Sequence, residues 1–203
     1  AGDDTSIEKH TYQDGTCTLC GAEEPIDTID LSSCKMSLSE VKYTYDGTEK
    51  EPTVTIANGD QVLKEGTDYT VTYSNNVNAG TASVSATGKG NYTGTITKTF
   101  TIKKADQEIR ATISSANLVE KETATIEVNA ATGALSYSSS NTAVATVDKD
   151  GVVTAVSIGT ATITITAEGN ENYNAATTAI EITVTEKPQP HTHEYGDPVF
   201  EWA

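Results

Sequence analysis

The residues best suited to chemistry in this 203-residue chain are two cysteines and a histidine near its start. Cys17 and Cys20 form a C-x-x-C motif followed by Gly21, and His10 precedes the pair. Two thiolates on a tight turn are typical of a zinc site, and the glycine lets backbone amides approach the sulfur atoms. We therefore expect His10, Cys17 and Cys20 as candidate zinc ligands, and no other cofactor.

The candidate zinc site lacks a fourth ligand nearby, although structural zinc is nearly always bound by four. His191, His193 or a residue outside this sequence would have to supply it. A local disulfide and two free thiols are the competing interpretations of the same motif. The remaining cysteine, Cys34, has no histidine near it in sequence, so we expect a small buried side chain rather than a nucleophile.

The rest of the chain offers little for catalysis. All three histidines lie in the terminal segments. The region between these segments contains no histidine, so a histidine-based catalytic triad is excluded there. Two carboxylate pairs, Asp148 with Asp150 and Glu120 with Glu122, lie in polar stretches where solvated charge is the ordinary explanation. Calcium at the first pair is disfavoured because the intervening lysine repels the ion. We therefore expect a non-enzymatic protein.

The composition of the chain limits the classes of partner and of fold that we expect. The net charge of −16 argues against nucleic acid, which would be repelled. No apolar run approaches the roughly 18 residues that a membrane span needs. A hydrophobic content of 36% suits thin β-sandwiches better than one large core. The abrupt C-terminal end suggests a fragment of a larger protein, and we expect this fragment to be monomeric.

Residues 144–167 show the strongest structural pattern. Two short apolar runs, separated by a turn signal at residues 148–151, precede a strictly alternating stretch that starts at Gly159. Such alternation is typical of a half-buried strand. One face of this stretch carries Ala161, Ile163, Ile165 and Ala167, and the other carries Thr160, Thr162, Thr164 and Thr166.

The sequence of this region resembles that of the bacterial immunoglobulin-like group 2 domains of surface proteins. The motifs that match are Ser-Ser-Asn at 139–141, Val-Ala-Thr-Val at 144–147, Gly-Val-Val-Thr-Ala at 151–155 and Gly-Thr-Ala-Thr-Ile-Thr at 159–164. The resemblance implies an immunoglobulin-like sandwich over about residues 107–185.

An earlier region, about residues 34–103, resembles the MBG-type β-sandwich repeats of Gram-positive surface proteins. The resemblance rests on residues 66–76, 80–82 and 90–94. Asn-Gly and other glycine-rich turns supply the positive φ that tight hairpins need. We expect strands at 38–45, 53–56, 69–73, 81–87 and 95–103. Lys98 shares the parity of the inward residues of the last strand, which predicts a bulge or an edge strand.

An internal comparison supports two related units. Residues 80–92 align with 159–173, and in both copies a strand is followed by a Gly/Asn loop and a tyrosine, Tyr92 or Tyr173. We interpret the asparagine as the turn former and the tyrosine as a plug for the end of the sandwich. The spacing suits an immunoglobulin-like sandwich.

The predicted fold is therefore all-β, with two tandem immunoglobulin-like β-sandwich domains and flexible terminal segments. We expect a polar tail at 1–28, sandwiches at 29–104 and 105–185, and a Pro-rich linker with the start of a further segment at 186–203. The junction at 103–106 lacks Gly and Pro, so a restricted hinge is expected.

The predicted function is that of a spacer or adhesion module at the surface of a Gram-positive type bacterium, extracellular or secreted. The alternative is a module that binds a glycan or host protein through residues 75–80 or 169–173. Exposed neighbouring tyrosines would favour that alternative, and buried ones would favour the spacer. An intramolecular isopeptide bond at Lys98 is a further possibility.

Overall fold

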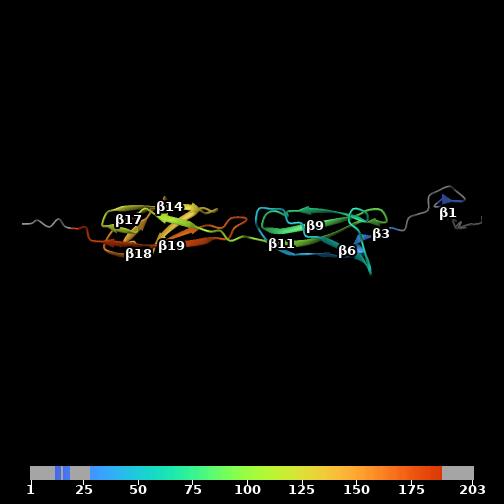
Figure 1. Ribbon diagram of the computed structural model, residues 1–203, viewed down its shortest axis with the longest axis horizontal. Coiled ribbons are helices and arrows are strands. Elements are labelled where there is room, and N and C mark those ends of the chain that lie inside the picture. The colour runs from blue at the N-terminus through green and yellow to red at the C-terminus, as the bar shows by residue number, and fades with distance from the viewer. Residues whose placement is uncertain (1–11, 15, 19–27, 189–203) are drawn as a thin grey trace, which may run out of the picture. The chain divides into compact units, whose positions relative to one another are not determined.

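The computed structural model describes residues 12–14, 16–18 and 28–188 of the chain (Figure 1). The chain divides into two compact units, residues 1–103 and 104–203. Apart from one 3-10 turn, η1 (Leu31–Ser33), the regular structure of the described residues consists of β-strands. The all-β sandwich prediction is confirmed. The predicted flexible ends lie almost wholly outside the described residues.

The first unit is a sandwich of a three-stranded and a four-stranded sheet. The strand orders are β4-β6-β7 and β5-β11-β9-β8, and a short parallel pair joins β3 to β10. Its strands are β3 (Ile29–Asp30), β4 (Lys35–Leu38), β5 (Lys42–Thr44), β6 (Val54–Asn58), β7 (Gln61–Val62), β8 (Tyr69–Ser74), β9 (Gly80–Gly88), β10 (Tyr92–Thr93) and β11 (Thr95–Lys103).

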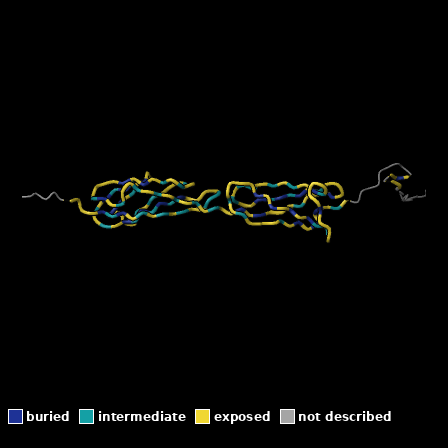
Figure 2. The backbone as a smooth tube through the Cα atoms, viewed as in Figure 1, coloured by how far each residue is buried: buried dark blue, intermediate teal, exposed yellow. Residues whose placement is uncertain are grey.

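The core of the first unit lies between these two sheets. Ile56 from one sheet and Val84 and Phe100 from the other are almost fully buried in a single cluster. Along β9, the buried residues Ala82, Val84 and Ala86 alternate with half-buried ones, and buried segments recur along the strands in Figure 2. Each large apolar side chain buried in this way contributes roughly 1.5–3 kcal/mol.

The second unit is a sandwich of two four-stranded sheets, with strand orders β12-β14-β17-β16 and β13-β19-β18-β15. Its strands are β12 (Arg110–Ile113), β13 (Asn117–Val119), β14 (Thr123–Ala130), β15 (Leu135–Ser139), β16 (Ala145–Val147), β17 (Val152–Ala155), β18 (Gly159–Ala167) and β19 (Ala176–Thr185).

Strand β18 has the bounds and the orientation that the alternating pattern predicts. Its four apolar residues, Ala161 to Ala167, are at most 3% exposed. Gly159 opens the strand with φ 145°, the same value as Gly80 at the start of β9. A Cβ atom at Gly159 would lie 2.9 Å from a methyl carbon of Val144, so this position requires glycine.

The expected single strand at residues 38–45 is wrong. The chain forms two strands there, β4 and β5, which belong to different sheets. Ser39 stands at the switch: its N–H donates to the Thr53 carbonyl (3.0 Å), and the Thr53 N–H donates to Ser39 Oγ (2.9 Å). Because the side chain replaces a backbone acceptor, the strand can leave the sheet without an unpaired amide.

The same arrangement recurs twice in the second unit. Ser114 lies between β12 and β13 and exchanges the equivalent two bonds with Thr125. Ser140 lies between β15 and β16 and exchanges them with Thr162. In each case the chain crosses from one sheet of the sandwich to the other.

Lys98 lies in β11 without the predicted bulge, since the β11–β9 register is continuous. Strand β11 is interior only where β5 covers it, from Thr101 to Lys103, so Lys98 stands on the uncovered part. Its Nζ donates to the Met36 carbonyl of the facing sheet at 3.0 Å. The lysine therefore tethers the two sheets at their open side. An isopeptide bond needs an asparagine and an acid, whereas this contact is to a backbone oxygen.

Candidate functional site

The candidate zinc ligands are only partly described. Strands β1 (Tyr12–Gln13) and β2 (Thr16–Cys17) form an antiparallel hairpin with Asp14 at φ 51° in its turn, and Cys17 is 2% exposed. His10, Cys20, His191 and His193 lie outside the described residues. Zinc binding stays a prediction, which native mass spectrometry with and without a chelator would test.

Across residues 12–14, 16–18 and 28–188, no three His, Cys, Asp or Glu side chains are grouped in a way that could hold a metal ion. Asp148 Oδ1 instead accepts the N–H groups of Asp150 and Val152, both at 2.9 Å. The Asp150 carboxylate accepts from Lys149. Asp148 therefore closes the turn between β16 and β17, and Asp150 forms an exposed ion pair with its neighbour.

Glu122, from the second carboxylate pair, and Cys34 have structural roles as well. Glu122 Oε2 accepts the Val119 N–H at 3.0 Å, which closes the turn between β13 and β14. Cys34 is 8% exposed and belongs to the core cluster of the first unit, as predicted.

The loop at residues 169–173, a candidate ligand loop, binds the incoming segment of its own unit. The Ala105 N–H donates to the Asn172 carbonyl (2.9 Å), and the Asn174 N–H donates to the Ala105 carbonyl (2.8 Å). Ala105 thus pairs in parallel with Tyr173. Asn170 Oδ1 shapes the loop by accepting the N–H groups of Asn172 and Tyr173.

The equivalent loop of the first unit makes the equivalent contact. The Ile29 N–H donates to the Asn91 carbonyl at 2.9 Å, and Ile29 pairs in parallel with Tyr92. The Asn-Tyr motif found in both copies therefore holds the segment that enters each unit. We refer to the Ile29–Tyr92 and Ala105–Tyr173 pairs as the entrance pairs.

Gln107 fastens the entrance of the second unit with its side chain. Its Nε2 donates to the carbonyls of Glu168 (2.9 Å) and Asn174 (2.8 Å). Its Oε1 accepts both the N–H and the Oγ1–H of Thr132, each at 2.9 Å. One amide thereby joins three segments that are distant in sequence.

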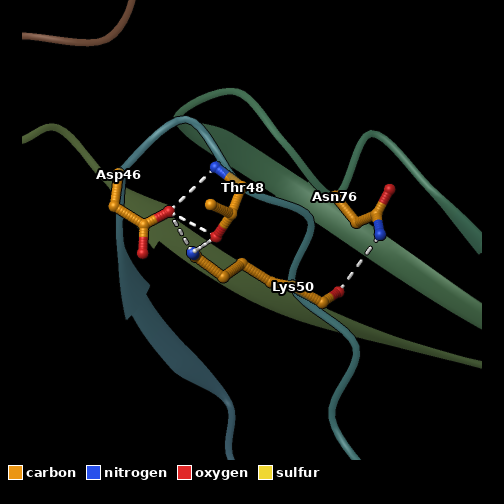
Figure 3. A network of polar contacts seen from close by, with 4 residues as sticks. All are labelled: Asp46, Thr48, Lys50 and Asn76. Carbon is orange, nitrogen blue, oxygen red and sulfur yellow. Dashed lines mark hydrogen bonds and ion pairs between the residues drawn. The ribbon is translucent and has the colours of Figure 1, made fainter.

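The other candidate ligand loop, residues 75–80, is bound to the β5–β6 connection (Figure 3). The Lys50 N–H donates to the Asn76 carbonyl, and Asn76 Nδ2 donates to the Lys50 carbonyl. Lys50 is 8% exposed, and its ammonium group contacts Asp46 Oδ1 and Thr48 Oγ1. These bonds from Lys50 and Thr48 hold the pKa of the Asp46 carboxyl far below its usual value.

The tyrosines whose side chains are described are not exposed. Tyr69 and Tyr92 are buried. Five others are half-buried: Tyr43, Tyr45, Tyr73, Tyr137 and Tyr173. The hydroxyls of Tyr69 and Tyr73 donate to the carbonyls of Val54 and Pro52, and burial raises the pKa of both phenols. Carbohydrate modules present exposed aromatic faces, and these side chains do not.

Three polar residues that fasten the turns and loops, Ser39, Lys50 and Gln107, are not singled out by the sequence. Gln107 and Lys50 lie in stretches without a repeated motif, so no signal pointed to them. The serine switches carry no signal in the alternation either, because Ser39, Ser114 and Ser140 each take an exposed, polar position in phase with the strand that they follow.

A shallow surface depression is lined by Val119, Glu120, Lys121, Glu122 and Lys187. Its lining carries charges of both signs, so it offers no distinct ligand chemistry. In the part of the chain that the structure describes, no helix has the length and hydropathy needed to cross a membrane.

Comparison with protein families finds one match, to the model described as the immunoglobulin-like domain of intimin. It covers residues 132–169, which include β15 to β18 and the alternating pattern. This supports an immunoglobulin-like assignment for the second unit, though not the group 2 family or the MBG type in particular. No curated protein matches the chain.

Among solved structures, the chain is similar to the S-layer protein SbsC, with 21% identity over 80% of this chain and a TM-score of 0.35. It spans 29% of that protein's resolved length. A structure of SbsC domains 4 and 5 matches at 22% identity over 74% of this chain and 96% of that one, with a TM-score of 0.28. The protocadherin GammaB4 extracellular domain matches at 12% identity over 79% of this chain and 34% of that one, with a TM-score of 0.30.

Proposed function

We propose that this chain is a non-enzymatic spacer in an exported bacterial surface protein of the Gram-positive type, with an MBG-like unit followed by a group 2 immunoglobulin-like unit. Its task would be to present other domains at a distance, or to take part in surface attachment. The observation that supports this most is the use of the candidate ligand loops: both bind other segments of their own unit.

The alternative, a glycan- or protein-binding module, has less support. It requires loop groups and aromatic faces that are open to a ligand. The Asn172 and Asn76 carbonyls are instead engaged with Ala105 and Lys50. The described tyrosine side chains are buried or half-buried.

Two experiments test the proposal. An antibody raised against this chain should label intact cells of the source bacterium, and brief protease treatment of intact cells should remove the signal. Labelling only after cell lysis would contradict a surface location. The antibody against a cytoplasmic enzyme of the same cells is the control.

Binding is tested separately with the purified chain on a glycan array and on immobilised extracellular-matrix proteins. A spacer gives no saturable signal. Saturable binding that an Asn75→Ala or Glu171→Ala variant abolishes would instead establish the binding module, because both side chains are exposed on the candidate loops.

A further inference from the structure

The last strand of each unit occupies an interior position in its sheet. Strand β11 lies between β5 and β9, and β19 lies between β13 and β18. These strands have 9 and 10 residues, and β19 pairs with β18 along nine residues. The strand through which the chain leaves each unit is therefore paired on both of its edges near its C-terminal end.

An early strand of each unit runs parallel to the end of this last strand. In the first unit, Lys42 to Thr44 pair with Thr101 to Lys103. In the second unit, Asn117 to Val119 pair with Thr183 to Thr185. Two flanking bonds extend the first pair, from the Tyr45 N–H to the Lys103 carbonyl (2.8 Å) and from the Thr101 N–H to the Val41 carbonyl (3.0 Å). We call these the terminal pairs.

Parallel pairing decides how such a pair responds to tension. When a unit is pulled by its two ends, the early strand is drawn backwards along its axis and the last strand forwards. The hydrogen bonds between two parallel strands are then sheared together. If the strands were pulled apart from the same end, the bonds would instead break one after another. The first mode has the higher barrier because several bonds must fail at once.

We propose that each unit is a load-bearing module, in which the entrance pair and the terminal pair form a mechanical clamp against tension along the chain. The two units share this device despite their different strand numbers: each has an entrance pair at its Asn-Tyr loop and a terminal pair at the end of its last strand. This goes beyond the proposed function, since a spacer holds distance without necessarily resisting force. The clamp proposal does not depend on where the protein is located, because it concerns only the response of each unit to tension along the chain.

Single-molecule force spectroscopy on the full chain tests the proposal through its pulling geometry. Forced unfolding depends on the unfolding barrier, so the unfolding force reports the clamp. Handles at the two chain ends shear both units. In a second version, an azide-bearing residue replaces Glu49, an exposed residue just after β5, and carries the handle instead of the N-terminus.

Pulling between position 49 and the C-terminus draws β5 and β11 apart from the same end, while the second unit is still sheared. We expect the unfolding force of the first unit to shift well below that of the second unit, whose force stays unchanged and serves as the internal reference. Equal unfolding forces of the first unit in the two geometries would overturn the proposal.

A pair of variants tests the terminal pair itself. Thr101→Pro removes the N–H that donates to the Val41 carbonyl. Thr99→Pro is the matched control: both side chains are exposed, and strand alternation places the Thr99 N–H on the same side of β11, where β5 does not reach. With end handles, Thr101→Pro should lower the force and Thr99→Pro should lower it less.

Equal effects of the two prolines would argue against the clamp. If Thr101→Pro fails to fold, the comparison of pulling geometries still decides the matter. Antibody labelling of intact cells does not depend on either force experiment. Labelling without a difference in unfolding force would indicate a surface protein without a clamp. A difference in unfolding force without labelling would indicate a clamp in a protein located elsewhere.

Discussion

The N–H of Ser114 donates to the carbonyl of Thr125, and the N–H of Thr125 donates back to the Ser114 hydroxyl, both at 3.1 Å. This reciprocal pair holds the point at which the chain leaves the sheet of β12 for the sheet of β13. The pairs Ser39–Thr53 and Ser140–Thr162 repeat it. At each of the three switches, a serine hydroxyl thus accepts the backbone N–H that would otherwise lose its partner.

The serine switches predict a small and specific loss of stability. Ser114→Ala leaves the Thr125 N–H without its acceptor and should lower the free energy of unfolding of the second unit by about 1 kcal/mol. Urea denaturation measures the loss. Ser138→Ala on the exposed face of β15 is the control and should change stability by less than about 0.5 kcal/mol. Equal losses for the two variants would show that the switch bond contributes nothing.

Gln107→Ala should weaken the entrance of the second unit. The change removes three good hydrogen bonds to backbone groups and one to the Thr132 hydroxyl, so we expect a loss of about 2 kcal/mol. Amide hydrogen exchange should become faster at Ala105 and Asn174 before it does so in β18. Glu108→Ala breaks only an exposed ion pair with Arg110 and should have little effect. Unchanged exchange at Ala105 would contradict the role of Gln107.

The Asp46 carboxyl should make the stability of the first unit depend on pH. Its folded pKa is depressed by Lys50 and Thr48, so its contribution is fully present above the ordinary pKa of 3.8 and is lost as pH falls below that value. The difference in unfolding free energy between the native sequence and Asp46→Asn should therefore be constant near neutrality and shrink in acid. Denaturation series at several pH values measure it.

The control for this prediction is the Lys50→Met background. Without the ammonium group, Asp46→Asn should have a much smaller effect, because the largest cause of the depressed pKa is gone. If Asp46→Asn still changed the unfolding free energy to the same pH-dependent extent in the Lys50→Met variant, the pH dependence would not arise from the Asp46–Lys50 pair.

Cys34 should react with thiol reagents only when the first unit opens. The side chain is 8% exposed and packed in the core. Alkylation followed by peptide mapping should show slow labelling of Cys34 in buffer and rapid labelling in urea. Met36→Ala, in the same cluster, should accelerate labelling by lowering the stability of the core. Fast labelling of the native chain would contradict the burial.

The sequence predicted what depends on local pattern and missed what depends on tertiary pairing. Strand β18 was predicted to the residue because alternation and the opening glycine are local signals. The break at Ser39 was missed, since Val41, Tyr43 and Tyr45 continue the alternation while the chain changes sheet. Periodicity alone does not say which sheet a strand joins.

The same distinction applies to the candidate site. Both Asn-Tyr motifs were recognised as turns with a plugging tyrosine, and Tyr92 is buried at 7% exposure. Their contact with Ile29 or Ala105 was not foreseen because the partner lies more than 60 residues away in sequence. Gln107 was missed for the same reason: its partners come from the segments around Thr132, Glu168 and Asn174.

The junction of the two units has a consequence for proteolysis. The Lys103 carbonyl is bonded within the first unit and the Ala105 N–H within the second, so Lys104 alone separates them along the chain. A protease needs an extended run of several residues in its active site, and trypsin would find its lysine here flanked by hydrogen-bonded backbone. Cleavage at Lys104 therefore requires the edge of one unit to open first. A cut at this lysine would report local opening of a unit rather than an exposed tether.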